Sequence, residues 1–147
     1  MPQVRVKVIE VANFMEETIQ QKVLVVDDSP LAREVVIQML SDIDVEVITA
    51  ESGEEALERF QEQEFALILL DVNMGGISGF ETASKIRLMD HSNNNVPIIF
   101  VTASSTDTTN IFQGYEAGAV DYLLKPVDRL TLCSKVTVFS RLHAQKD

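Results

Sequence analysis

The stretch that decides the fold is VLVVDD at residues 23–28, in which four aliphatic residues run directly into two aspartates. A continuous apolar run of this kind is typical of a strand that is buried on both faces of a sheet. Two carboxylates at its end must reach water or a partner, because an unpaired buried charge is costly. Asp27 and Asp28 therefore predict a polar rim at the carboxyl end of this strand.

Four similar apolar runs follow along the chain, and longer amphipathic stretches separate them. The runs are VEVIT (45–49), FALILL (65–70), PIIFVT (97–102) and VDYLLK (120–125). Most of them are too apolar for a strand with one face in water, which favours a parallel sheet with helices on both faces. Parallel neighbours need crossover connections, and these are nearly always right-handed. The sequence therefore predicts a doubly wound α/β fold of five strand–helix units.

The helices between these runs have recognisable first residues. Ser29 and Pro30 predict an N-cap followed by proline at the first helical position, and Leu31, Val35 and Met39 then repeat at helical spacing. The other predicted starts are Ser52 with Glu55, Ser78 with Glu81, Thr106 or Asp107, and Asp128. The asparagine run at 93–95 is predicted to be a solvated loop.

Polar side chains end four of the five predicted strands. They are Asp27, Asp28, Asp71, Thr102 and Lys125. In a parallel sheet these ends share one edge, and with strand order 2-1-3-4-5 the first and third strands flank the point where ligands bind. Crowded carboxylates resist joint ionisation unless a cation compensates them, and magnesium prefers such oxygen ligands. Lys125 and Thr102 suit phosphoryl oxygens, and Asp71 is both a metal ligand and a candidate nucleophile.

Composition and charge exclude several classes of protein. The 147 residues suit one domain rather than two, and the single cysteine, Cys133, rules out an internal disulfide. A formal net charge of −11 gives no electrostatic footprint for DNA or RNA, so we expect no direct nucleic-acid binding. No apolar stretch approaches the roughly 20 residues that span a bilayer, and no signal peptide is recognisable. We therefore expect no membrane association and a cytoplasmic location.

The segments VVDDSP, LLDVNMGGISGFE, PIIFVTA and GAVDYLLKP, in this order and spacing, resemble the receiver domain of two-component response regulators. The resemblance covers roughly residues 21–143 and implies a flavodoxin-like sheet with strand order 2-1-3-4-5. We accordingly expect a receiver domain at 21–147 and an N-terminal extension at 1–20. The pattern of the extension fits an added strand, a helix or the end of an upstream domain, and the sequence does not decide among them.

The resemblance also implies roles for the acidic residues. Asp71 would accept a phosphoryl group. Asp28, Asp71 and the backbone carbonyl of Asn73 would coordinate magnesium, and Asp27 would contribute through water. Two departures lie beside this site, because receivers commonly carry proline where this chain has Gly75 and aspartate where it has Ser78. Glycine favours a more mobile loop without the loss of a ligand.

At the other strand ends, the resemblance implies that Thr102 and Lys125 hold the phosphoryl group and that Tyr122 is the aromatic switch residue. It also implies a cis Lys125–Pro126 peptide bond. The modified surface is expected on the face of the fourth predicted helix, the fifth strand and the fifth helix. Asn73 and Ser104 follow Asp71 and Thr102 by two residues, so we expect them to border the path of attacking water and to tune the lifetime of the acyl phosphate.

The expected function is a phosphoryl-accepting switch that catalyses only its own phosphorylation and dephosphorylation. A histidine kinase or histidine phosphotransfer protein would supply the phosphoryl group, and a downstream protein or a second copy would read the result. A haloacid dehalogenase-type phosphatase usually has a second aspartate where this chain has Asn73. An FMN-binding flavodoxin needs hydroxyls and amides where this chain has DDSP. A module that binds partners without phosphorylation remains a third alternative.

Overall fold

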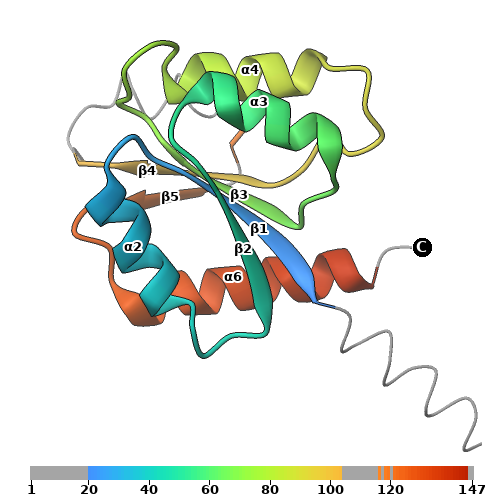
Figure 1. Cartoon of the computed structure of the whole chain (residues 1–147). Helices are drawn as coiled ribbons and strands as arrows, with labels where there is room; N and C mark the ends of the chain where they lie inside the picture. Colours follow the sequence, from blue (N-terminus) through green and yellow to red (C-terminus); the bar gives the residue numbers. More distant parts are fainter. Residues whose placement is uncertain (1–19, 104–115, 117, 120, 146–147) are drawn as a thin grey trace, which may run out of the picture.

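The structure, a computed structural model, describes residues 20–103, 116, 118–119 and 121–145. Its five strands form one parallel sheet in the order β2-β1-β3-β4-β5, as Figure 1 shows, which confirms the predicted architecture and strand order. The strands are β1 (Gln21–Val26), β2 (Val45–Ala50), β3 (Leu67–Asp71), β4 (Ile98–Thr102) and β5 (Asp121–Leu124). Residues 1–19 of the predicted extension at 1–20, the predicted helix start at Thr106 or Asp107, and Ser104 lie outside the described residues.

Helices cover both faces of this sheet (Figure 1). They are α2 (Pro30–Met39), α3 (Gly53–Glu62), α4 (Gly79–Leu88) and α6 (Arg129–Ala144). Helices α3 and α4 lie on one face, and α2 and α6 lie on the other, so that the strands are buried between two layers. Within the described ranges, no helix combines the length and the apolar character that crossing a membrane requires.

Successive residues of the central strands supply two separate cores. Leu24, Ile68 and Phe100 belong to the cluster under α3 and α4, whereas Val23 and Leu69 belong to the cluster under α6. This alternation follows from the strand period of two, which sends neighbouring side chains to opposite faces. Because both faces are covered, both sets are apolar, and the continuous runs of the sequence are explained.

The predicted helix caps are present in all four described helices. The side chains of Ser29, Ser52, Ser78 and Asp128 accept hydrogen bonds from the backbone N–H groups of Ala32, Glu55, Glu81 and Thr131, at 3.2, 3.0, 3.1 and 2.9 Å. The carboxylate of Glu55 reaches back as a capping box requires, but it accepts from the N–H of Glu51, at 3.2 Å. These caps fix where each loop at the carboxyl edge ends.

Two of the three residues in the apolar repeat of α2 lie on its exposed side. Leu31 is 74% exposed and Val35 is 41% exposed, and none of the residues of α2 is fully buried. Met39, the last residue of the repeat, packs against the core under α6 together with Val36. The repeat at i, i+4 and i+8 therefore located the helix correctly, but only Met39, its last member, contacts the core.

Candidate functional site

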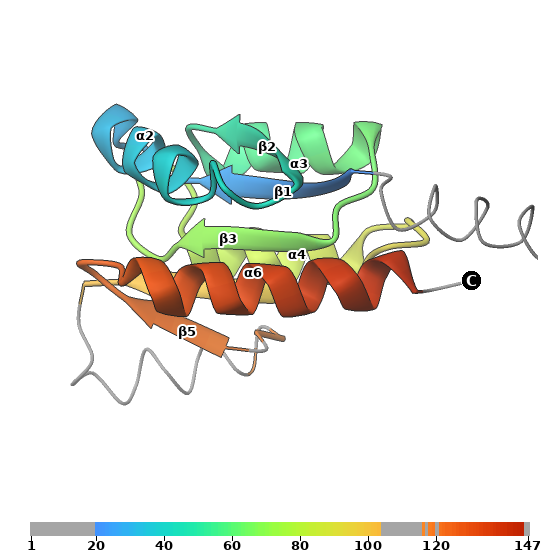
Figure 2. The same ribbon diagram turned by 90° about the horizontal axis from the view of Figure 1, so that it is seen from below.

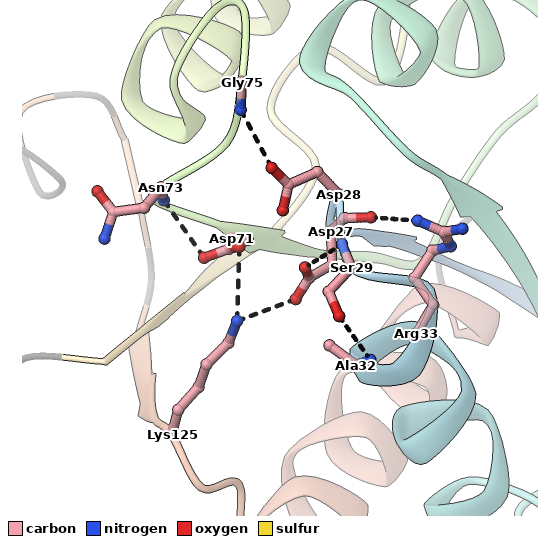
Figure 3. A network of polar contacts seen from close by, with 9 residues as sticks. All are labelled: Asp27, Asp28, Ser29, Ala32, Arg33, Asp71, Asn73, Gly75 and Lys125. Atoms are coloured by element: carbon pink, nitrogen blue, oxygen red, sulfur yellow. Dashed lines mark hydrogen bonds and ion pairs between the residues drawn. The ribbon is translucent and has the colours of Figure 1, made fainter.

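Three aspartates meet at the carboxyl edge of the sheet (Figure 3). Asp27 and Asp28 follow β1, and Asp71 is the last residue of β3, the strand beside β1. One carboxylate oxygen from each residue lies within 4.8 Å of those of the other two. Asp27 and Asp71 are buried, whereas Asp28 is exposed at the mouth of the cluster. Parallel topology thus brings together residues that lie more than 40 positions apart in sequence.

Lys125, which follows β5, extends its side chain into this cluster. Its Nζ lies 3.1 Å from Asp27 Oδ2 and 3.5 Å from Asp71 Oδ2, as Figure 3 shows. Its backbone N–H donates to the carbonyl of Thr102 at 2.8 Å, which continues the β4–β5 pairing past the strand end. The Lys125–Pro126 peptide bond is cis, as expected. The lysine therefore joins the first, third and last strands through one ammonium group.

The loop between β1 and α2 holds Asp27 from several sides. The N–H of Ser29 donates to Asp27 Oδ1 at 2.9 Å, and Nη1 of Arg33 donates to the Asp27 carbonyl at 2.7 Å. Arg33 also lies 4.0 Å from the carboxylate of Glu51, which follows β2. Sequence reasoning did not single out Arg33, because its contact depends on the loop turning back onto the helix. The contacts leave Asp27 little freedom to move.

The loop between β3 and α4 contacts the other two aspartates. The N–H of Asn73 donates to Asp71 Oδ1 at 3.3 Å, and the N–H of Gly75 donates to Asp28 Oδ2 at 3.2 Å. Gly76 has φ +77°, and a Cβ at this position would lie 2.8 Å from the Glu54 carboxylate. This loop conformation therefore requires glycine at position 76.

Burial and charge shape the protonation of the central carboxylate. Burial, followed by the negative charge of Asp27, raises the pKa of Asp71 to about 6, against the lowering influence of Lys125. Burial lowers the pKa of Lys125, but the two carboxylates raise it by more, so that it lies above its ordinary value. The three carboxylates and the one ammonium leave a formal excess of negative charge. This donor set fits a hard divalent cation such as magnesium.

Thr102 and Tyr122 lie on the neighbouring strands β4 and β5. Thr102 is the last residue of β4 and is 3% exposed. In the sheet register Asp71 pairs with Val101, so Thr102 ends its strand one position beyond the level of Asp71. The ring of Tyr122 is half-buried, and its centroid lies 5.8 Å from that of Phe100. The residues predicted for this edge therefore end or follow the strands as expected, and Tyr122 lies within β5. Ser104 lies outside the described residues.

This arrangement has a counterpart among known proteins. The family model described as "Response regulator receiver domain" matches residues 23–137. The chain belongs to the response regulator receiver domain family. It is therefore a receiver domain of two-component response regulators, which confirms the resemblance seen in the sequence.

Relatives of this receiver domain include longer regulatory proteins and solved response regulators. The transcriptional regulatory protein ResD of Bacillus subtilis is 34% identical over 131 residues, which are 89% of this chain and 52% of ResD. The chain spans about half the length, or less, of such curated relatives. The structure of the chemotaxis response regulator CheY4 of Vibrio cholerae has a TM-score of 0.74 and 35% identity, covering 82% of this chain and 98% of that one.

A second solved receiver is the response regulator TrrA of Thermotoga maritima, whose structure was determined in complex with Mg2+ and BeF. It has a TM-score of 0.71 and is 35% identical, with 82% of this chain and 99% of that chain covered. Each of the two solved chains is matched over almost its whole length. The fold of this chain is therefore that of these solved response regulators.

Proposed function

We propose that this receiver domain accepts a phosphoryl group on Asp71 from a histidine kinase or a histidine phosphotransfer protein. The observation that carries the proposal is the environment of the Asp71 carboxylate. It ends the central strand, is 5% exposed, and lies 3.5 Å from Lys125 Nζ within a cluster of three aspartates. With a pKa of about 6, the carboxylate is mostly ionised at pH 7 and can act as a nucleophile.

In the proposed reaction an oxygen of the Asp71 carboxylate attacks the phosphorus of the donor phosphoryl group. The new oxygen–phosphorus bond forms as the bond from phosphorus to the donor nitrogen breaks, and the leaving imidazole keeps the electron pair. Lys125, already held between Asp27 and Asp71, is positioned to pair with a phosphoryl oxygen. Such in-line transfer depends mainly on positioning and on stabilisation of charge.

Magnesium is the proposed cofactor, because the donor set fits a hard divalent cation and TrrA was solved in complex with Mg2+ and BeF. Asp28, Asp71 and the backbone carbonyl of Asn73 would hold it, with Asp27 contributing through water. When bound, the cation would neutralise charge on the carboxylates and on the phosphoryl oxygens. The structure itself supplies the Asn73 N–H on Asp71, which orients the attacking group.

Signal output is proposed to run through Thr102 and Tyr122. A phosphoryl group that draws the Thr102 hydroxyl inward would leave space for the Tyr122 ring, and a two-state motion of this kind can bias partner binding. The responding face includes β5 and α6, together with the predicted helix before Gly118. We propose that a separate downstream protein or a second copy of the chain reads this face, in the cytoplasm.

The proposed chemistry is limited to the domain's own phosphorylation and dephosphorylation. Asn73 and Ser104 would tune the second reaction, because they follow Asp71 and Thr102 by two residues. A haloacid dehalogenase-type phosphatase is disfavoured, since position 73, where its acid/base aspartate would stand, carries an amide.

The proposal is tested by intact mass after incubation with magnesium and a small acyl phosphate. We expect wild-type protein to gain the mass of one phosphoryl group and Asp71→Asn to gain none. Asp90→Asn is the matched control, because Asp90 is an exposed aspartate that follows the end of α4. This variant should be labelled like wild type.

Two results would contradict the proposal. Labelling that persists in Asp71→Asn would assign the phosphoryl group to another residue. A wild-type protein that is not labelled, although it is folded and magnesium is present, would favour a module that binds partners without phosphorylation.

A further inference from the structure

The contact between Gly75 and Asp28 links the loop after β3 to the exposed member of the aspartate cluster. The backbone N–H of Gly75 donates to Asp28 Oδ2 at 3.2 Å, across 47 positions in the sequence (Figure 3). Asp27 is buried and held by Ser29 and Lys125, and Asp71 is buried and held by Asn73 and Lys125. Asp28, by contrast, is exposed. A fixed donor is therefore most consequential at this carboxylate.

The geometry of this hydrogen bond leaves room for a metal ion. An ionised carboxylate has two oxygens and about four lone-pair sites, so a single N–H on Oδ2 leaves Oδ1 fully available. A donor that holds an exposed side chain in one orientation reduces the entropy that ligand binding would otherwise cost. The hydrogen bond and metal coordination by Asp28 are therefore compatible, and the first prepares the second.

The donor depends on the residue type at position 75. Proline has no backbone N–H, whereas glycine and alanine both have one. Receivers commonly carry proline at this point, so a donor at this position is a departure of this chain. A Cβ at Gly75 would meet nothing within 4 Å, and its φ does not demand glycine. Alanine should thus fit here without disturbing the loop.

We infer that Gly75 is a positioning residue whose N–H orients the Asp28 carboxylate for a divalent cation. The inference rests on the proposed function, in which Asp28 is a metal ligand. It has a second consequence, because coupling between two sites is reciprocal. A cation that fixes Asp28 also fixes the loop that binds to it, and the same loop carries the Asn73 N–H on Asp71. Occupancy of the metal site is therefore transmitted to residues 73–76.

The experiment compares Gly75→Ala, which keeps the N–H, with Gly75→Pro, which removes it. Magnesium affinity is measured by titration calorimetry without any phosphodonor. We expect Gly75→Ala to bind magnesium like wild type and Gly75→Pro to bind it about fivefold more weakly, the scale of one lost hydrogen bond to a partly exposed charged group. The unfolding midpoint without metal identifies any general damage to the fold.

A second readout follows amide exchange in the loop with and without magnesium. In wild type and Gly75→Ala, magnesium should slow exchange at residues 73–76. In Gly75→Pro the slowing at Gly76 should be reduced, whereas Asn73, which contacts Asp71 directly, should still respond. If Gly75 only shaped the loop, the proline substitution would change exchange equally with and without magnesium. If Gly75→Pro does not fold, wild type alone decides, and exchange at Gly75 that magnesium leaves unchanged overturns the inference.

The outcomes separate this inference from the proposed function. Equal magnesium affinity in the alanine and proline variants, or tighter binding by the proline variant, overturns the positioning role while the metal site stands. Wild-type protein that binds no magnesium overturns the metal site, and the positioning role falls with it.

Discussion

The buried carboxylate of Asp71 destabilises the folded state once it is ionised. Its pKa is about 6 in the folded chain, against an ordinary value of 3.8, because burial and Asp27 disfavour its charge. The folded state therefore holds this proton more tightly than the unfolded state does. The contribution of Asp71 to stability is fully present below pH 3.8 and is lost as the pH rises through about 6.

Asp71→Asn should remove this pH dependence, since the amide does not titrate. Without divalent metal, we expect the variant to be more stable than wild type above pH 7, by up to about 3 kcal/mol. The difference should shrink as the pH falls from 7 to 4. Urea unfolding of both proteins across this range measures it. A constant difference at all pH values would show that Asp71 is not the titrating group.

Asn93 is a second residue with a buried polar role, although the run at 93–95 was predicted to be a solvated loop. It is 2% exposed, and its Nδ2 donates to the carbonyl of Phe65 at 2.8 Å, just before β3. Asn93→Ala would leave this carbonyl without its donor and should lower the free energy of unfolding by about 1–3 kcal/mol. Asn95→Ala, at an exposed position, should change it by less than about 0.5 kcal/mol. Equal losses would contradict this assignment.

At the scale of elements, α2 is held by one side only. Leu31 is exposed on its first turn, whereas Leu40, just after its last residue, is 2% exposed. We expect Leu31→Ala to change the free energy of unfolding by less than about 0.5 kcal/mol. Leu40→Ala should cost about 2–5 kcal/mol, because it removes buried methyl groups and leaves a cavity. Denaturant titration distinguishes the two, and a large loss in Leu31→Ala would show that the exposed stripe supports the fold.

The helices also show which local signals a sequence carries reliably. Ser29 and Ser78 cap their helices as predicted, because a cap involves atoms only three residues apart. The buried side of α2 does not follow from the helical spacing of Leu31, Val35 and Met39 alone, since it depends on where α6 and the sheet lie. Apolar residues at Leu31 and Val35 share a helical face without sharing the core. Local chemistry thus locates an element, and tertiary packing decides its orientation.

At the scale of the whole molecule, the candidate site could be predicted because parallel topology collects strand ends at one edge. Asp27, Asp71 and Lys125 each follow or end a recognisable apolar run, so their meeting follows from the fold. The contacts of Arg33 and Gly75 could not be predicted, because each depends on the path of an irregular loop. Such paths are set by packing among segments far apart in the sequence.

Phosphorylation is expected to change the molecule on the side of its last strand and last helix. Beryllofluoride with magnesium mimics a phosphoryl group on an aspartate. Amide exchange with and without this mimic should differ in β5 and α6. The reason is that Thr102 ends β4 and Lys125 directly follows β5. Asp71→Asn should remove the response. Changes confined to α2 and α3 would contradict the proposed route of output.

The described chain enters and leaves the domain at one pole. Gln21 is the first residue of β1, and its Oε1 lies 2.5 Å from Nδ1 of His143, in the last turn of α6. In Figure 2 the strand arrows point away from this pole, and the aspartates lie at the other one, where β1 and β3 end. The domain can therefore be spliced into a host polypeptide through two short, neighbouring linkers. In such a chimera the host would lie on the side opposite the aspartates, and its bulk would not cover the edge of the sheet that carries them.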